Sequence, residues 1–148
     1  QVQRRDNPAM DERPDIPEGI GPHELRELEL MLAGEKPLAM FSDVVPSSFE
    51  WPEANFEPHV QAGTFVKREK ILRISDMPLP MRYVYYALPQ EDWRIDKLHA
   101  INAEIQTGRR KSTDQDEFDT GRLLGYSDDQ VRIFLRWLKK GRAKQTGT

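Results

Sequence analysis

The stretch that decides the fold is MRYVYYAL, residues 81–88. Its aromatic and β-branched residues are typical of a strand, and Pro78 and Pro80 end the segment before it. Because side chains alternate between the two faces of a strand, Tyr83 and Tyr85 face away from Val84 and Tyr86. Both faces are therefore apolar, and the pattern predicts a central strand of a sheet.

The segments around this strand predict the remaining elements. A helix over 22–32 is indicated by Pro22 at its first position, acids in its first turns and Gly34 beyond its end. Apolar residues at helical spacing predict a second helix over 89–105. Three short runs with β-favouring residues are the other strand candidates: PLAMF (37–41), VQAGTFV (60–66) and EKILRI (69–74).

The last third of the chain predicts two helices, over 116–124 and 128–140, that meet at a tight corner. Gly125 supplies the backbone freedom that ends the first helix, and Ser127 with Gln130 forms a capping box for the second. Gly121 is small enough to let the helices approach closely, and we expect Val131 and Phe134 to pack between them. This is the local arrangement of a helix-turn-helix.

The order of these elements predicts an α+β fold. We expect a small antiparallel sheet of three to four strands, covered on one side, with an N-terminal helix and three C-terminal helices. The last two helices form the helix-turn-helix-like corner. The predicted domains are a flexible tail over 1–19, one compact domain over 20–140 and a flexible basic tail over 141–148.

Composition narrows the class of protein. The chain has 148 residues and no cysteine, which excludes disulfides, thiolate catalysis and cysteine-ligated metals. No run approaches the roughly 18 apolar residues of a membrane span, and the charged first 15 residues do not form a secretory signal. We therefore expect a soluble, cytoplasmic protein that does not bind membranes.

Charge distribution bears on nucleic-acid binding. Residues 109–148 hold ten Lys and Arg against six Asp and Glu, and Arg136, Lys139 and Lys140 lie on the last helix. The reading end of a helix-turn-helix is the start of its second helix, where this chain has Asp128 and Asp129. Two carboxylates repel a polyanion, so nucleic-acid binding is disfavoured and stands as a second alternative.

The segment SSFEWPEANFEPH, residues 47–59, fits neither helical nor strand periodicity. It sets Phe49, Trp51 and Phe56 among glutamates and prolines, and such aromatic residues on a stiffened loop favour recognition of a protein partner. The alternative is that the loop folds back and its aromatic residues cap the sheet. Trp137 on the last helix is a further candidate contact.

Candidate catalytic residues are sparse. The histidines are His23, His59 and His99, and none has the HxH or HExxH spacing of a metal site, so we predict no metal and no cofactor. The best enzymatic alternative is a small cofactor-independent or metal-assisted enzyme that uses His59 or His99 with nearby carboxylates. Its candidate residues also include Arg82, Tyr83 and Asp96, on the predicted central strand and the helix after it.

These observations favour a small, soluble, non-catalytic binding or regulatory protein that acts through contacts with another protein. A homodimer is an open alternative, because periodicity does not separate an exposed apolar face from a buried one. The enzyme and the nucleic-acid binder are the alternatives from other classes.

Overall fold

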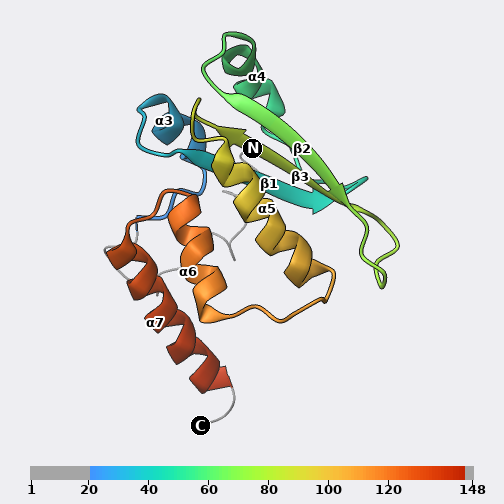
Figure 1. The fold of residues 1–148 in the computed structure, drawn as a ribbon, viewed down its shortest axis with the longest axis vertical. Coiled ribbons are helices and arrows are strands. Elements are labelled where there is room, and N and C mark those ends of the chain that lie inside the picture. Colours follow the sequence, from blue (N-terminus) through green and yellow to red (C-terminus); the bar gives the residue numbers. More distant parts are fainter. Residues whose placement is uncertain (1–20, 146–148) are drawn as a thin grey trace.

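The computed structural model of the chain describes residues 21–145, which form an α+β fold (Figure 1). The predicted tail over 1–19 and residues 146–148 lie outside the described residues. The elements, in chain order, are α3 (Glu27–Leu32), β1 (Leu38–Val44), α4 (Glu53–Gln61), β2 (Val66–Leu72), β3 (Met81–Ala87), α5 (Trp93–Gln106), α6 (Asp114–Leu123) and α7 (Asp128–Gln145).

The three strands form one antiparallel sheet in the order β1-β3-β2, so the prediction that residues 81–88 supply the central strand is confirmed. Tyr85 pairs with Met40 of β1 on one side and with Arg68 of β2 on the other. The predicted strand over 60–66 is wrong. Its first two residues end α4, residues 62–65 form the turn that follows, and only Val66 joins the next candidate in β2.

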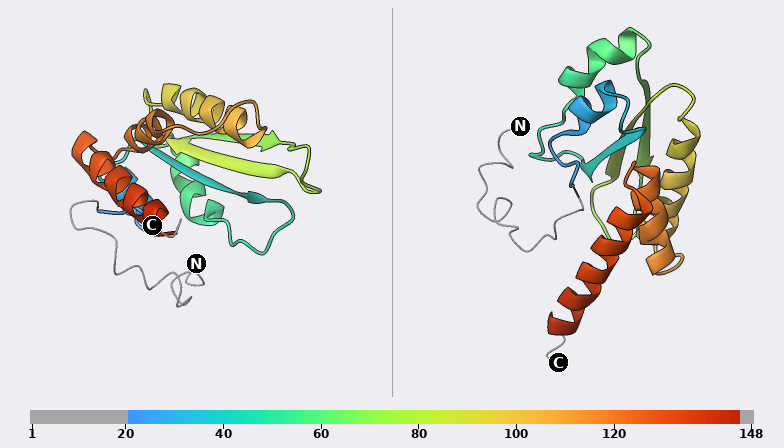
Figure 2. Two further views of the ribbon diagram at one scale, coloured as in Figure 1. Left: turned by 90° about the horizontal axis from the view of Figure 1, so that it is seen from below. Right: turned by 90° about the vertical axis from the view of Figure 1, so that its left-hand side faces the viewer.

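Both faces of the sheet are covered, because both faces of β3 are apolar. Val84 and Tyr86 pack with α3 and α4, while Tyr83 and Tyr85 pack with α5 (Figure 2). The expectation of a sheet covered on one side is therefore wrong. The first core is aromatic, with Phe41, Phe56 and Phe65 around Tyr86, and the second includes Ile95, Leu98 and Leu123.

Helix α4 occupies most of the segment that was expected to be irregular. Its sequence carries few apolar residues and contains Pro58, so its periodicity is weak. The helix is fixed by packing, because Phe56 is 2 % exposed and its ring stacks on Tyr86 with centroids 4.2 Å apart. Tertiary burial here outweighs a poor local propensity.

The first predicted helix is shorter than expected. It forms only from Glu27, since Leu25 has a φ of 70° and interrupts the helical path after Pro22. The predicted stop at Gly34 is confirmed by its φ of 77° and by its N–H, which donates to the Met31 carbonyl.

The predicted corner between the last two helices is confirmed. The Gln130 N–H donates to Ser127 Oγ at 3.1 Å, and the Ser127 N–H donates to Gln130 Oε1 at 2.8 Å. Gly121 permits the close approach, because a Cβ there would lie 2.7 Å from Val131 Cγ2. Gly125 makes the turn with a φ of 105°.

Helix α7 runs to Gln145, so it continues past the predicted end at Lys140 and includes the first residues assigned to the C-terminal tail. Its C-terminal half extends away from the sheet (Figure 2). Among the helices of residues 21–145, none is both long and apolar enough to cross a lipid bilayer.

Candidate functional site

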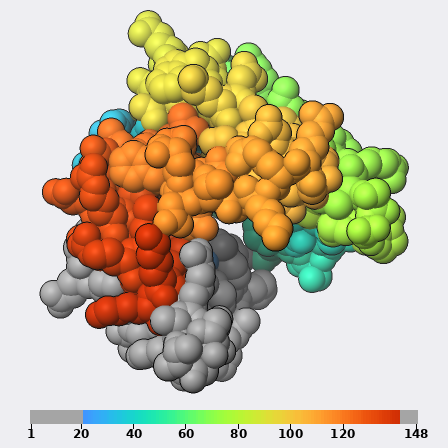
Figure 3. All heavy atoms as spheres, turned by 60° about the horizontal axis from the view of Figure 1, so that its bottom comes forward, coloured from blue at the N-terminus to red at the C-terminus, as the bar shows by residue number. Residues whose placement is uncertain are grey.

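A cavity of about 570 Å³ lies between α5, α6 and α7. Figure 3 shows these helices in yellow to red on one face of the molecule. The cavity is closed at one end by the segment that enters α3 and by the corner before α7. Its lining comprises Pro22, Glu24, Ile101, Asn102, Ile105, Gln106, Ser112, Asp116, Glu117, Thr120, Gly121, Leu124, Tyr126, Gln130, Val131 and Phe134.

The floor of the cavity is apolar. Ile101 and Ile105 lie one turn apart on α5, and Val131 and Phe134 face them from α7. Phe134 is 37 % exposed, and the Trp137 ring lies 5.6 Å from it, so the apolar surface continues along α7. The three helices therefore leave apolar surface in contact with water, in a volume typical of ligand sites.

The charged residues of the lining are acidic. Glu24, Asp116 and Glu117 belong to the lining, whereas none of the described lining residues is a lysine or arginine. Asp116 is paired, because the Arg110 guanidinium donates to its two oxygens at 2.6 and 2.8 Å. These bonds, with the backbone N–H of Thr113, hold the pKa of Asp116 well below its usual range.

A buried lysine fixes the end of the cavity formed by Pro22, Glu24 and Tyr126. Lys36 is 2 % exposed, and its Nζ donates to the Leu124 carbonyl at 2.6 Å and to His23 Nδ1 at 2.9 Å. The His23 ring stacks on the Tyr126 ring with centroids 3.8 Å apart, and the His23 backbone N–H donates to the Tyr126 hydroxyl at 2.7 Å. This cluster ties the segment before α3 to the corner before α7.

The ionisable groups of this cluster are strongly perturbed. Burial, followed by the charges of Lys36 and Arg26, lowers the pKa of His23 to about 4. Burial also lowers the pKa of Lys36 to about 8, and the nearby Glu27 opposes this shift. At neutral pH, Lys36 is thus mostly charged and His23 is neutral, which agrees with a lysine that donates to Nδ1.

The structure divides the predicted catalytic residues between the two faces of the sheet. Tyr83 and His99 lie on the α5 side of the sheet, where the Tyr83 ring contacts the His99 ring edge-on at 5.4 Å. Asp96 is exposed on α5. His59 lies on α4 beside Phe65, and Arg82 also lies on the α4 side. None of these five lines the cavity.

The His99 ring is part of a small polar cluster behind the cavity wall. Its Nδ1 lies 2.9 Å from the Tyr85 hydroxyl, and Asn102 Nδ2 donates to the same hydroxyl at 3.2 Å. Burial lowers the pKa of His99. Of these residues, only Asn102 lines the cavity. The cluster therefore holds the Asn102 side chain in position, and His99 does not belong to the site.

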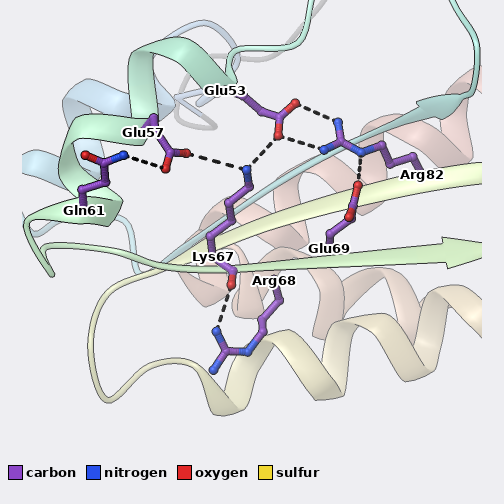
Figure 4. A network of polar contacts seen from close by, with 7 residues as sticks. All are labelled: Glu53, Glu57, Gln61, Lys67, Arg68, Glu69 and Arg82. Atoms are coloured by element: carbon purple, nitrogen blue, oxygen red, sulfur yellow. Dashed lines mark hydrogen bonds and ion pairs between the residues drawn. The ribbon is translucent and has the colours of Figure 1, made fainter.

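Arg82 belongs instead to an ion-pair network between α4 and the sheet (Figure 4). Its guanidinium binds both oxygens of Glu53, at 2.9 and 2.8 Å, and also binds Glu69. Lys67 donates to Glu53 at 2.8 Å and lies 3.8 Å from Glu57. The pKa of Glu53 is lowered to about 2, mainly by its hydrogen bonds from Arg82. Arg82 is therefore held by its neighbours.

The residues predicted to contact a partner have different environments. Phe56 is a core residue, so its side chain is not available to a partner in this structure. Phe49 and Trp51 form an edge-on pair at 4.9 Å that packs against the core, and Arg82 lies over the Trp51 ring at 4.6 Å. These contacts agree with the alternative that the aromatic residues cap the sheet. Trp137 is half-buried beside Phe134 at the cavity.

The cationic residues on α7 are partly engaged within the chain. Lys139 Nζ lies 2.9 Å from Asp114 Oδ2, whereas Arg136 and Lys140 are exposed. At the other end of the helix, Asp128 Oδ1 lies 2.6 Å from the Arg122 Nε. The carboxylates that disfavour nucleic acid thus lie at the start of α7, and Asp128 is held toward α6.

The cavity itself was missed by the sequence reasoning, although Val131, Phe134 and Trp137 were singled out. Ile101 and Ile105 have the spacing of core residues, and nothing in that spacing says that α6 leaves them partly uncovered. Across residues 21–145, no group of His, Asp and Glu side chains is arranged to hold a metal ion. No protein-family model, curated protein or solved structure matches this chain.

Proposed function

We propose that this chain is a binding protein and that the cavity between α5, α6 and α7 receives an apolar segment of a partner protein. The observation that carries the proposal is the apolar floor of Ile101, Ile105, Val131 and Phe134, part of which is open to solvent. Burying such a surface favours association by roughly 25 cal/mol for each Å² removed from water.

The shape of the cavity suits a short segment. It follows α6, whose ten residues extend about 15 Å at the usual helical rise. A segment of two to three helical turns has that length. Trp137 extends the surface beyond Phe134 and supplies the large, rigid kind of side chain that often dominates interface energies.

The charge of the lining adds selectivity to this proposal. The charged residues of the described lining are all acidic, which favours a partner segment with lysine or arginine beside its apolar face over an acidic segment. The absence of cysteine supports a reducing compartment such as the cytoplasm as the place where this binding occurs.

The test is co-purification from the source cells with three forms of the chain: unmodified, Phe134→Asp and Ile71→Asp. Both substitutions place a carboxylate at an exposed apolar position, but Ile71 lies on β2, away from the cavity, and is 55 % exposed. Proteins lost with Phe134→Asp and kept with Ile71→Asp are then purified, and their affinity for each form is measured by calorimetry. We expect at least a tenfold loss for Phe134→Asp alone. Equal affinity for all three forms would exclude the cavity as the site.

A further inference from the structure

We propose that His23, Lys36 and Tyr126 form a proton-operated latch, in which protonation of His23 releases residues 21–26 and dismantles one end of the cavity. This inference concerns regulation of the site described under the proposed function. The latch itself is defined by contacts within the chain, so it can be tested without a partner.

The latch depends on a neutral histidine. An ammonium group has only donors, so His23 Nδ1 must accept the bond from Lys36, which places the ring proton on Nε2. A proton added at Nδ1 removes the acceptor and sets two cations 2.9 Å apart. The bond then becomes a repulsion, in a place where Lys36 has little access to water.

Lys36 has little freedom to move away from this repulsion. Its Nζ is also bonded to the carbonyl of Leu124, one of the last carbonyls of α6, where a cation is favoured by the helix dipole. Its backbone packs against the corner, since a Cβ on Gly125 would lie 2.8 Å from Pro37 Cδ and 3.6 Å from Lys36 Cα. The histidine is therefore the side that yields.

Other charges near the latch do not offset a proton on His23. Arg26, on the same segment, acts in the same direction as Lys36 and disfavours the imidazolium. Glu27 acts on Lys36, and Glu24 and Glu27 act on Tyr126. The aromatic partner, Tyr126, is neutral, because burial raises the pKa of its hydroxyl.

Release of His23 reaches the binding site directly. Pro22 and Glu24, on either side of His23 in the sequence, line the cavity together with Tyr126, the ring on which His23 stacks. Loss of the stack and of the His23 N–H bond to Tyr126 frees three lining residues at once. Acid therefore weakens whatever the cavity binds, and neutral pH restores the site.

The size of the effect follows from linkage. In the released state His23 has an ordinary pKa near 6.5, whereas in the latched state the pKa is about 4. Between these two values, the ratio of released to latched molecules rises by up to about tenfold for each unit that the pH falls.

The experiment is an NMR titration of the full chain from pH 7.5 to 4. We expect the Cε1–H signal of His23 to titrate well below 6.5, and the Tyr126 ring signals and the amides of 23–26 to move with the same midpoint. Signals at the far end of the cavity, from Ile105 and Ser112, stay in place. His23→Gln abolishes the shared transition, while His99→Gln, which alters another half-buried histidine, leaves it unchanged.

Two further variants test the geometry. Lys36→Met removes the nearest cation, so a proton on His23 no longer meets a positive charge 2.9 Å away and the stack on Tyr126 persists to lower pH. If Lys36→Met does not fold, Tyr126→Phe tests the same point, because it removes the acceptor of the His23 N–H and moves the midpoint up toward 6.5. A His23 that titrates near 6.5 with Tyr126 unmoved overturns the latch, as does a transition that survives in His23→Gln. A working latch in a chain whose partner binds elsewhere contradicts only the proposed function.

Discussion

The two sides of the sheet bury their apolar residues to different degrees. On the α4 side, the space beneath the helix is filled by Phe41, Phe56, Phe65 and Tyr86. The ion pairs around Arg82 join α4 to the sheet beside this core (Figure 4). On the other side, α5 covers the strands, but a cavity of about 570 Å³ remains where α5 meets α6 and α7. The core on the α4 side is therefore filled, whereas the other side leaves an apolar cavity whose burial by a partner would favour association.

The largest expected difference between the two sides comes from removing a phenylalanine from each. Phe56→Ala leaves a void in the aromatic core and should lower the free energy of unfolding by about 3–5 kcal/mol. Phe134→Ala trims a ring that is already 37 % exposed and should cost about 1 kcal/mol or less. Urea unfolding of the two variants measures both values. Equal losses would show that the cavity side is as well packed as the α4 side.

A smaller effect is expected at the helix corner. Gly121→Ala places a methyl group 2.7 Å from Val131 Cγ2, so α7 must shift, and the free energy of unfolding should fall by about 1–3 kcal/mol. In a Val131→Ala background, the same substitution should cost much less, because the clashing methyl groups are gone. Unfolding of the single and double variants gives the coupling. Additive losses would mean that the two helices are not held by this contact.

Acidification should affect the two sides in different pH windows. The pKa of His23 is lower in the folded chain, about 4 against 6.5, so its contribution to stability is present above 6.5 and is lost as the pH falls toward 4. The pKa of Glu53 is also lower in the folded chain, about 2 against 4.5, so its contribution is lost between those values. After solvent screening, we expect about 1–2 kcal/mol from each group.

Stability measured against pH separates these two groups. His23→Gln should flatten the curve between about 6.5 and 4 and leave the more acidic part unchanged, whereas Glu53→Gln should do the reverse. A single shared window in both variants would contradict the assignment of the two groups to separate sides.

The smallest expected effect concerns the Arg82 network. Arg82→Lys keeps the charge but loses the two parallel bonds to Glu53, and it should cost about 1 kcal/mol in the free energy of unfolding. Lys67→Arg at the neighbouring position of the same network is the matched control and should change stability little. If the network only stabilises the fold, both variants keep full affinity for the partner. A loss of affinity in Arg82→Lys would show that the partner binds on the α4 side instead of at the cavity.

Much of the fold follows from local sequence signals, and the elements that were missed depend on packing. The apolar faces of residues 81–88 and the glycine and capping signals around Gly125 and Ser127 predicted β3 and the corner correctly. Helix α4 was missed because its local pattern is weak and Phe56 is held by contacts with distant residues. The start of α3 was misplaced because His23 is held by Tyr126, 103 residues away.

The candidate site was predicted less well than the fold, for a related reason. A cavity is the space that several elements fail to fill, and no single helix carries a signal for it. The sequence carries no signal for the burial of Lys36, because a lone lysine between a helix and a strand usually lies in water. Its burial arises only when the Leu124 carbonyl and His23 come together around it.

The most direct test of the open side is xenon binding observed by NMR of methyl groups in the full chain. An apolar cavity accepts xenon without any knowledge of the natural partner. We expect shifts at the methyl groups of Ile101, Ile105 and Val131, reduced when Val131→Phe fills the space, and none at Val84 in the aromatic core. An absence of shifts at the cavity, or equal shifts at Val84, would contradict the distinction between an open and a closed side.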